Sequence, residues 1–391
     1  MGNVPNLRFP EFSGEWVTKS INDLAVVIGG GTPDTTVKSY WDGEIQWFTP
    51  SEIGKNKYVD SSLRTITEVG LNNSSAKLLP PNTILLSSRA TIGECSLSLR
   101  ECATNQGFQC LVSKKCNVDF LYYLIQTKKK DLIRKSCGST FLEISANEVR
   151  KIQVSVPSDV EQQKIAELLS LIDERIATQN KIIEKQQSLI KGIVDNLMTA
   201  LLKGELYPFS SFYIKAGEGG TPTTSVDEYY SEGTIPFIKI DDLSCKYLTS
   251  NKEFITELGM QKSSAWLIPS QSVIYSNGAT IGAISINEYP VCTKQGILGI
   301  VPNTNVNVEY LFLLMSSSFF SKEVNRIITE GTMKTAYLKD INHIKCPLPS
   351  MAQQKSITNL TSSIEEKLYT EKKLLKFLNL QKQHLLRTMF I

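Results

Sequence analysis

Two stretches of the chain carry apolar side chains at alternating intervals of four and three residues, with Glu, Lys and Gln between them. This spacing is typical of helices that pair along one narrow apolar seam. In the first stretch the seam comprises Ile165, Leu169, Ile172, Ile176, Gln179, Ile183, Gln186, Ile190, Ile193, Leu197 and Ala200. In the second it comprises Ile357, Thr361, Ile364, Leu368, Glu371, Leu375, Leu378, Lys382, Leu385 and Met389. The pattern predicts two long helices, each with a polar step at Gln179 or Glu371.

Each of these helices would expose an apolar stripe if it stood alone. Pairing of the two would cover both stripes, and because a globular segment lies between them, either orientation is sterically possible. The alternative interpretation is that each stripe faces the core of a larger bundle. A narrow seam flanked by charged and amide side chains favours the pair.

Outside these stretches the pattern changes to short apolar runs separated by Gly, Pro, Asn and Asp. Runs such as NTILLSS at 82–88 and QSVIYSN at 271–277 are typical of strands bounded by turns. Two helical stretches, near 120–135 and 309–328, interrupt these runs. The pattern therefore predicts an α+β organisation with mixed β-sheet and helices.

Short motifs recur in the same order along the chain. Gly-Thr-Pro at 31–33 returns at 220–222, and Ala-Thr-Ile-Gly at 90–93 returns at 279–282. TNQG at 104–107 matches TKQG at 293–296, and VPSDVEQQKI at 156–165 matches LPSMAQQKSI at 348–357. The displacement drifts only between 189 and 193 positions. We infer a tandem duplication of one structural unit.

Composition narrows the class of protein. With 391 residues, 41% of them hydrophobic and 21% charged, the chain suits about two globular domains. The net charge of +3 is small for a protein that neutralises many phosphates, so a nucleic-acid role would need local patches or a basic partner. The start of the chain lacks a signal-peptide pattern, and no run of about 20 apolar residues could cross a bilayer. We expect a cytoplasmic protein without a membrane partner.

Several chemistries lack the residues that they need. The eight cysteines include no Cys-x-x-Cys pair, so we expect most of them to be small core side chains. Only two histidines, His343 and His384, are present, which argues against a metal site or a histidine-based triad. No phosphate-binding loop motif and no Asn-Pro-Pro-aromatic motif of an adenine methyltransferase occurs. We expect no bound cofactor, no metal and no catalytic residue.

Two globular halves, each closed by Pro-Ser, a Gln-Gln-Lys and a long helix, resemble the DNA specificity subunit of type I restriction-modification systems. PNLRFPEFSGEW at 5–16 and KQHLLRTMF at 382–390 are also similar to that family. The resemblance implies two target recognition domains, each reading one half of a split double-stranded DNA sequence. It further implies that the long helices pack antiparallel as a spacer and dock two DNA-adenine methyltransferase subunits and restriction/translocase subunits. S-adenosylmethionine and ATP would belong to those partners.

The expected fold is thus two similar α+β target recognition domains separated by two long helices in an antiparallel, coiled-coil-like spacer, with an internal pseudo-two-fold repeat. We place the first recognition domain at 1–156 and the first spacer helix at 157–206. The second recognition domain follows at 207–349, and the second spacer helix at 350–391.

The duplication also suggests which residues read DNA. Features that both halves share serve the fold or the phosphates, whereas polar residues that differ at matched positions are candidates for base contacts. Arginine suits guanine and asparagine suits adenine in the major groove, so the exchange of Ser88-Arg89 for Asn277-Gly278 would change the preferred base. The other candidates are Thr49 against Lys239, Asn105 against Lys294, and Ser139 and Thr140 against Thr332, with Lys334 following. Gln106 and Gln295 are shared, which favours fixing of the loop. For each of these positions a solvated loop residue is the alternative.

Three shared or basic features have a structural alternative beside the functional one. In the Gly-Thr-Pro turns we expect glycine to supply a positive φ before a rigid proline, with a phosphate-binding nest as the alternative. Ala-Thr-Ile-Gly is expected to be a strand-ending turn. Lys128, Lys129 and Lys130, with Arg134 and Lys135 nearby, form the densest basic cluster. That cluster is either a phosphate track or a solvated helix face.

Two other functions remain open at this point. A coiled-coil scaffold with protein- or glycan-binding repeats explains the heptads but not the polar exchanges at matched turns. A nuclease could hold magnesium through Asp241, Asp242 and Glu253. The first half, however, offers only Ser51-Glu52 in the matching place.

Overall fold

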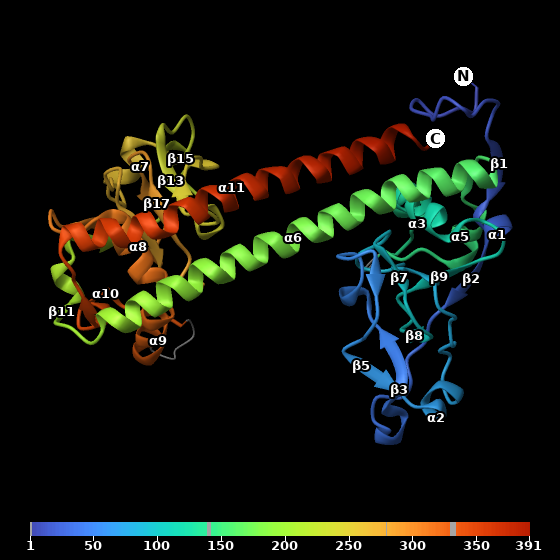
Figure 1. The fold of residues 1–391 in the computed structure, drawn as a ribbon, viewed down its shortest axis with the longest axis horizontal. Coiled ribbons are helices and arrows are strands. Elements are labelled where there is room, and N and C mark those ends of the chain that lie inside the picture. Colours follow the sequence, from blue (N-terminus) through green and yellow to red (C-terminus); the bar gives the residue numbers. More distant parts are fainter. Residues whose placement is uncertain (1, 139–141, 279, 329–333) are drawn as a thin grey trace. The chain divides into compact units, whose positions relative to one another are not determined.

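The computed structural model describes residues 2–138, 142–278, 280–328 and 334–391. It divides into two compact units, one of Met1–Lys181 with Lys373–Ile391 and the other of Ile182–Lys372. Each unit holds one globular domain and one part of each of two long helices, α6 (Asp159–Leu201) and α11 (Met351–Thr388) (Figure 1). Both helices lie inside the helical regions expected from the heptads. None of the helices in the described ranges is long and apolar enough to cross a bilayer.

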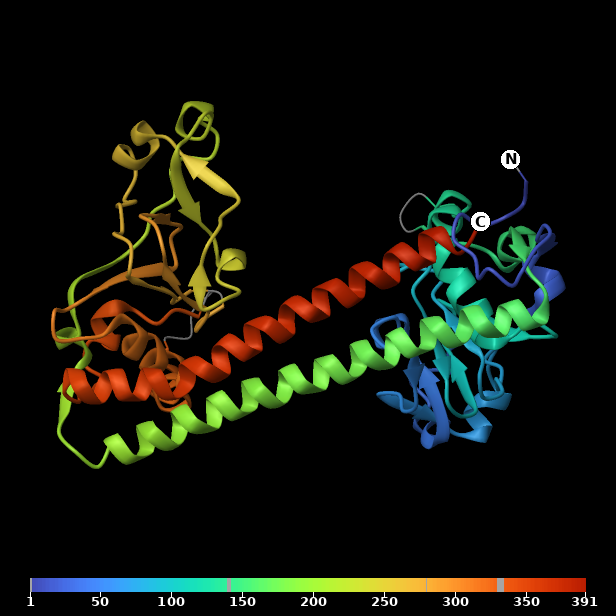
Figure 2. The ribbon, with the colours of Figure 1, turned by 45° about the horizontal axis from the view of Figure 1, so that its top comes forward.

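The two long helices lie side by side and antiparallel within each unit (Figures 1 and 2). In the first unit, Lys382 of α11 forms an ion pair with Asp173 of α6 at 2.7 Å, and Leu169 and Leu385 share one core. In the second unit, Met198 near the end of α6 and Ile357 near the start of α11 belong to one core. The predicted pairing of the helices is confirmed.

Near the end of α6, in the second unit, the buried face of the helix shifts by one residue position. Ile165, Leu169, Ile172 and Ile183 are buried as the heptads predict. Near the end of α6 the buried side chains are Val194 and Met198, one position after the predicted Ile193 and Leu197, and Ala200 is exposed. One residue rotates the face of a helix by about 100°. Here α6 packs on the core of the second domain, which widens the apolar face beyond a two-helix seam.

The first domain contains three sheets. Over the described residues, a five-stranded sheet has the order β2-β9-β6-β7-β4, a three-stranded sheet has the order β5-β3-β8, and β1 pairs with β10. The pairs β3·β8 and β4·β7 are parallel and the others are antiparallel, so the sheets are mixed. The strands are β1 (Val17–Ser20), β2 (Ala25–Gly29), β3 (Trp41–Phe48), β4 (Tyr58–Val59), β5 (Arg64–Ile66), β6 (Ile84–Leu86), β7 (Cys95–Ser98), β8 (Cys102–Thr104), β9 (Gln109–Ser113) and β10 (Gln153–Val156).

The second domain repeats this topology strand for strand. Its sheets have the orders β12-β19-β16-β17-β14, β15-β13-β18 and β11-β20, so each strand takes the place of the strand ten numbers lower. These strands are β11 (Leu206–Pro208), β12 (Tyr213–Glu218), β13 (Ile235–Ile238), β14 (Tyr247–Leu248), β15 (Glu253–Ile255), β16 (Val273–Ser276), β17 (Ile284–Asn287), β18 (Cys292–Thr293), β19 (Ile297–Pro302) and β20 (Lys345–Pro347). The duplication inferred from the motifs is therefore a duplication of the fold.

Shorter helices connect and cover the sheets. In the first domain they are α1 (Ile21–Leu24), η1 (Lys38–Tyr40), η2 (Pro50–Glu52), α2 (Glu68–Asn72), α3 (Val118–Thr127), α4 (Lys129–Arg134) and α5 (Ala146–Lys151). In the second they are η3 (Phe209–Ser211), η4 (Asp227–Tyr229), η5 (Ile240–Asp242), α7 (Glu257–Gln261), α8 (Val308–Ser316), α9 (Ser318–Ile327) and α10 (Leu338–Ile341). The stretches expected to be helical near 120–135 and 309–328 are each divided in two, at Lys128 and at Ser317.

Helix α3 joins the first domain to the long helices, and α8 does so in the second. Phe120–Ile125 are all buried, and their side chains belong to one core with the five-stranded sheet, α6 and α11. A glutamine fixes each joint. Gln162 accepts a hydrogen bond from the backbone N–H of Asn117, the N-cap of α3, at 3.0 Å. Gln354 accepts one from Asn307, the N-cap of α8, at 2.7 Å. The repeated Gln-Gln motif is thus structural.

The N-terminal segment belongs to the same joint. The guanidinium of Arg8 donates two hydrogen bonds to the buried carboxylate of Glu161, at 2.8 and 2.7 Å. The backbone N–H of Leu7 donates to the carbonyl of Thr388 at 2.9 Å, so the first residues lie against the end of α11. The two chain ends accordingly lie near each other within the first unit (Figure 2).

Candidate nucleic-acid interface

Loops that are far apart in the sequence meet at one place in each domain. In the first domain the backbone N–H of Asn105 donates to Phe48 at 3.1 Å, and that of Ser88 donates to Gly107 at 2.8 Å. The N–H of Ile144 donates to Ser88 at 3.0 Å. We call the loops joined in this way, 48–50, 87–94, 104–107 and 142–144, the first loop cluster.

The second domain forms a matching cluster from 238–240, 276–278, 293–296 and 334–337. The N–H of Lys294 donates to Ile238 at 3.0 Å, that of Asn277 to Gly296 at 3.0 Å, and that of Ala336 to Asn277 at 2.9 Å. These are the counterparts of the three bonds in the first cluster. The two clusters therefore have matching backbone hydrogen bonds, and they differ in their side chains.

Most of the candidate residues lie in these clusters, but their exposure differs. Arg89, Gln106, Lys294, Gln295 and Lys334 are exposed, whereas Thr49, Asn105 and Lys239 are half-buried. Ser139, Thr140 and Thr332 lie outside the described residues. The exposed group is the part of the clusters that can meet a ligand without rearrangement.

The pair singled out by the Ser88/Asn277 exchange lies below the surface. Ser88 is 0% exposed and Asn277 is 1% exposed. The side-chain amide of Asn277 donates to the carbonyl of Ala336 at 3.1 Å, which ties two loops of the second cluster together. Neither Ser88 Oγ nor Asn277 Oδ1 finds a hydrogen-bond partner among the described residues. In this conformation neither side chain reaches a DNA groove, and their base contacts stay a prediction.

Arg89 remains accessible but is not isolated. Its Nε lies 3.6 Å from the Glu143 carboxylate, and both side chains are partly exposed. An exposed ion pair of this kind contributes little to stability. The guanidinium can therefore leave Glu143 for a base or a phosphate at small cost.

Thr49 and Lys239 occupy the same place at the start of a short helical turn. The hydroxyl of Thr49 donates to Glu52 at 2.6 Å, while the ammonium of Lys239 forms an ion pair with Glu253. The carboxylate of Asp242 accepts the backbone N–H of Lys239 at 2.9 Å. These bonds use two of the three carboxylates proposed for a nuclease. Among the described residues, no group of three His, Cys, Asp or Glu side chains could hold a metal ion.

The glycines of the Gly-Thr-Pro turns are needed for a different reason from the one expected. Gly30, Gly31, Gly219 and Gly220 are absent from the positive-φ residues of the chain, so the expected positive φ was wrong. A Cβ on Gly31 would collide with the backbone of Ser75 and Ala76, and one on Gly30 with that of Thr104 and Asn105. The turn is bare because two backbones pass too close for any side chain.

The Ala-Thr-Ile-Gly segment of the first domain is the turn between β6 and β7, as expected, with Gly93 at a φ of 87°. Of the shared glutamines, Gln106 links two loops through its side chain, whereas Gln295 does so through its backbone. The hydroxyl of Thr32 donates to Gln106, and the backbone N–H of Gln295 donates to Thr221 Oγ1 at 3.4 Å. Each links the Gly-Thr-Pro turn to the loop cluster.

The basic cluster lies at the junction of α3 and α4, apart from the candidate loops except for one contact. The ammonium of Lys128 donates to the carbonyl of Ile391 at 2.6 Å, and burial lowers the pKa of Lys128. Lys129 forms an ion pair with Glu94 at 2.5 Å, next to the turn of the first loop cluster. Lys130 is exposed. Of the three lysines, Lys130 is the one that needs no rearrangement to meet a phosphate.

One pair of residues escaped the sequence analysis. Lys57 and Lys246 occupy matched positions just before β4 and β14, and each is half-buried against a long helix. The shared dipeptide Lys-Tyr, at 57–58 and 246–247, is the signal that could have identified them. Because lysine is rarely buried, a Lys-Tyr dipeptide by itself does not indicate a contact inside the fold.

Comparison with known proteins identifies the family of this chain. Residues 13–186 and 213–380 each match the family model described as the type I restriction modification DNA specificity domain. Since the two matches cover most of the chain, the protein belongs to this family and contains the domain twice. A DNA specificity family decides against the protein- or glycan-binding scaffold and against the nuclease.

The chain is similar to specificity subunits of type I restriction enzymes, over most of the length of one relative and under half of another. The chain is 29% identical over 384 residues to the MjaIX type I restriction enzyme specificity subunit of Methanocaldococcus jannaschii, covering 92% of this chain and 89% of that protein. It is 31% identical over 175 residues to the EcoR124I/EcoR124II specificity subunit of Escherichia coli, covering 43% of each. Relatives of this kind are specificity subunits of a type I complex, and this chain is likewise a non-catalytic specificity subunit.

Two solved structures share the fold. The S subunit of a type I restriction-modification system from M. genitalium superposes with a TM-score of 0.57 at 18% identity, covering 99% of each chain. A chain from a structural study of type I complex assembly gives a TM-score of 0.55 at 14% identity, covering 96% of this chain and 97% of that one. At these identities the likeness concerns the fold alone.

Proposed function

We propose that this specificity subunit directs its complex to an asymmetric, bipartite DNA target, each domain reading one half through its loop cluster. The observation that carries the proposal is that the two loop clusters have matching backbone hydrogen bonds but different side chains at corresponding positions. Asn105 and Lys294 stand at the same place in the two clusters, as do Thr49 and Lys239. Identical readers would recognise identical half-sites, so different side chains at one geometry make the target asymmetric.

The chemistry of these side chains suits base edges. An asparagine amide both donates and accepts hydrogen bonds and pairs with adenine, whereas lysine only donates and prefers the acceptors of guanine. Lys294 is exposed and Asn105 is half-buried, with its carbonyl oxygen accepting the N–H of Gly107 at 2.8 Å. The remaining amide protons of Asn105 are the groups that it can offer to DNA.

The methylation and cleavage steps lie on other subunits in this proposal. Two DNA-adenine methyltransferase subunits bring S-adenosylmethionine, restriction/translocase subunits bring ATP, and the complex works in the cytoplasm on double-stranded DNA. The small net charge of +3 supports this division, because the partners then supply much of the grip on phosphates.

The long helices offer surface for these partners. Leu171 and Leu189 of α6 and Tyr369, Phe377 and Leu380 of α11 are exposed apolar side chains on the helices, outside the shared seam. Exposed apolar side chains are frequent at protein–protein contact sites. We assign these side chains to contacts with the methyltransferase subunits.

Methylome sequencing tests the proposal. The chain is expressed with its methyltransferase subunits in a host without adenine methylation, and methylated adenines are mapped over the genome. We expect one motif made of two different short sequences separated by a fixed number of unspecified base pairs. A single continuous motif, or two identical halves, would contradict the assignment of one half-site to each domain.

Reciprocal variants serve as the matched control. Lys294→Asn gives the second cluster the side chain of the first, and Asn105→Lys does the reverse. We expect each variant to change or weaken recognition in one half-site alone, with about 1–3 kcal/mol of discrimination lost at the affected base pair. A change in both half-sites from one substitution would show that the two clusters do not read separately.

A further inference from the structure

A lysine in each domain reaches away from the sheet and is buried against a long helix. The side chain of Lys57 is 7% exposed and that of Lys246 is 17% exposed. Each directly precedes the shortest strand of its five-stranded sheet, β4 or β14. Burying an ammonium group is costly unless it is paired, so both lysines need specific partners.

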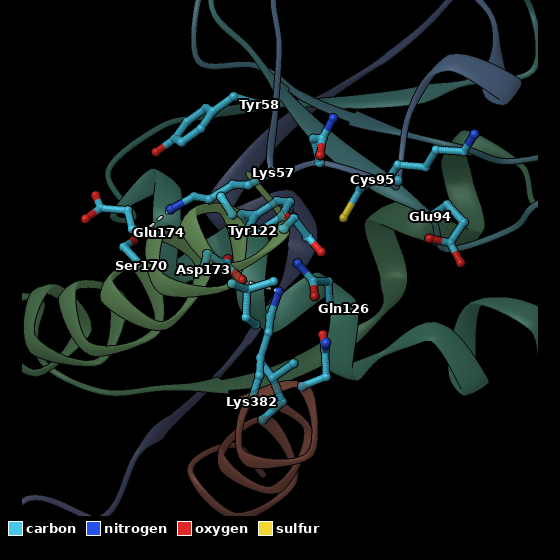
Figure 3. A pocket seen from close by; sticks show the side chains of 18 of the residues that line it. Lys57, Tyr58, Glu94, Cys95, Tyr122, Gln126, Ser170, Asp173, Glu174 and Lys382 are labelled. Atoms are coloured by element: carbon cyan, nitrogen blue, oxygen red, sulfur yellow. Dashed lines mark hydrogen bonds and ion pairs between the residues drawn. The ribbon is translucent and has the colours of Figure 1, made fainter. Parts of the chain in front are cut away.

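In the first unit, Lys57 contacts two helices at once. Its Nζ lies 2.6 Å from Oδ1 of Asp119, in the first turn of α3, and donates to Oγ of Ser170 of α6 at 2.7 Å. Figure 3 shows Lys57 next to Ser170. The rings of Tyr58 and Tyr123 lie 5.0 and 4.9 Å from the ammonium, a distance that suits a cation–π contact. The sheet, α3 and α6 are thus joined through one group.

The second unit repeats the arrangement with a stronger pair. Lys246 forms ion pairs with Glu309, in the first turn of α8, and with Glu365 of α11, the latter at 2.5 Å. The rings of Tyr247 and Phe312 lie 5.3 and 5.6 Å away. Burial lowers the pKa of Lys246, but the bonds to Glu309 and Glu365 outweigh it and the pKa lies above its usual value. The lysine stays charged.

The two joints differ on the side of the long helix. Asp173 is the counterpart of Glu365 in the repeat, yet it pairs with Lys382 of α11 at 2.7 Å and accepts the hydroxyl of Tyr123 at 2.7 Å. Lys57 therefore has a neutral hydroxyl as its partner on the long helix, where Lys246 has a carboxylate. Removing Lys57 leaves the helix–helix ion pair of the first unit intact.

The surroundings of Lys57 indicate that its side chain fixes the position of the domain on α6 and is not part of a hydrophobic core. A pocket of about 740 Å³ lies between the loops 54–58 and 93–95 of the domain and the long helices. Lys57, Ser170, Asp173 and Lys382 all line it (Figure 3). Beside this pocket, the ammonium of Lys57 bridges the end of the sheet to Ser170 of α6.

We propose that Lys57 and Lys246 are positioning residues that fix the angle at which each recognition domain leaves its long helix. In this way they set the register between the two half-sites on DNA. The inference rests on the bipartite recognition proposed above. Neither lysine needs to touch DNA, and neither selects a base.

The test uses the full complex with methyltransferase subunits and the variant Lys57→Met, which keeps an apolar stem but removes the ammonium. Methylation rates are measured on duplexes with the natural spacer and with spacers one base pair shorter and longer. We expect the rate at the natural spacer to fall about tenfold. This is less than the roughly hundredfold cost of misplacing a reacting group by about 1 Å. We expect the natural spacer to be favoured less strongly over the shorter and longer spacers than in the wild type. The sequences of both half-sites should stay unchanged.

Arg100→Met is the matched control, because it removes an exposed ion pair with Asp60, 2.7 Å long, from the same domain without touching a helix. We expect wild-type rates and spacer preference from it. Unchanged rates and spacer preference in a folded Lys57→Met complex would overturn the inference. If Lys57→Met does not fold, Ser170→Ala decides in the same way, since it removes only the hydroxyl on α6. A wild-type complex without a bipartite motif would instead overturn the proposed function, before any variant is compared.

Discussion

At the scale of single residues, burial determines which of the eight thiols can react. Cys95, Cys102, Cys110, Cys292 and Cys346 are buried, Cys116 is half-buried, and Cys137 and Cys245 are exposed. Burial raises the pKa of Cys95, Cys102, Cys110, Cys116 and Cys346 to about 12 and that of Cys292 to about 11. Most cysteines are core side chains, as their spacing suggested.

This burial predicts two classes of thiol. Because the thiolate is the reactive form and a raised pKa keeps a thiol protonated at pH 8, the six buried or half-buried cysteines should react slowly. We expect an aromatic disulfide reagent to label two thiols of the folded chain quickly and the other six only after denaturation. The variant with Cys137→Ser and Cys245→Ser should lose the fast phase. Fast labelling of four or more thiols would mean that the cores open easily.

The exchange at Ser88 and Asn277 shows what a sequence comparison misses at this scale. Two matched positions with different polar residues look like readers, yet both side chains are below the surface. Exposure depends on which loops cover a turn, and here 142–144 and 334–337 do so from far along the chain. Lys57 and Lys246 show the reverse case, because their partners on α3, α8 and the long helices lie far away in sequence and no local pattern indicates them.

At the scale of elements, local periodicity predicted what local forces determine. The heptads placed α6 and α11, and the runs 82–88 and 271–277 contain β6 and β16. The strand orders could not be predicted, because pairs such as β3·β8 and β2·β9 join residues far apart in sequence. The face of α6 at Val194 and Met198 was missed because the second domain, together with the start of α11, defines it.

The exposed apolar side chains of α11 carry a prediction at this scale. Phe377 is 67% exposed, so Phe377→Ser removes little from the folded chain but much from a partner contact. Burying an aromatic side chain is worth about 1.5–3 kcal/mol, so we expect the Kd for a methyltransferase subunit to rise by about one to two decades. Isothermal titration calorimetry measures the Kd, and an unchanged Tm shows that the fold persists.

Leu63→Ser is the control for that experiment, since Leu63 is 86% exposed and lies in a loop of the first domain. It should leave the affinity for the methyltransferase subunit unchanged. Equal weakening by both variants would indicate general surface effects, and no weakening by Phe377→Ser would place the docking surface elsewhere.

At the scale of the whole molecule, both long helices pass from one compact unit into the other. The division falls between Lys181 and Ile182 in α6 and between Lys372 and Lys373 in α11. Along the chain, the residues that lead from one unit to the other are therefore helical. If the subunit reads two half-sites, the length of these helices is the variable that the spacer between the half-sites should follow.

Insertion of four residues after Gln179 and four after Glu371 changes that length close to the division in both helices. Four residues add about 6 Å of helix, which corresponds to about two base-pair steps of 3.4 Å, and we expect the preferred spacer to lengthen accordingly. Four added residues also rotate a helix about 40° past a full turn, so some rate should be lost even at the new optimum. Methylation of duplexes with graded spacers measures both effects.

Insertion into α6 alone should abolish methylation, because it shifts one half of the seam against its partner. An unchanged spacer preference after the double insertion would show that the helices connect the domains without setting their separation.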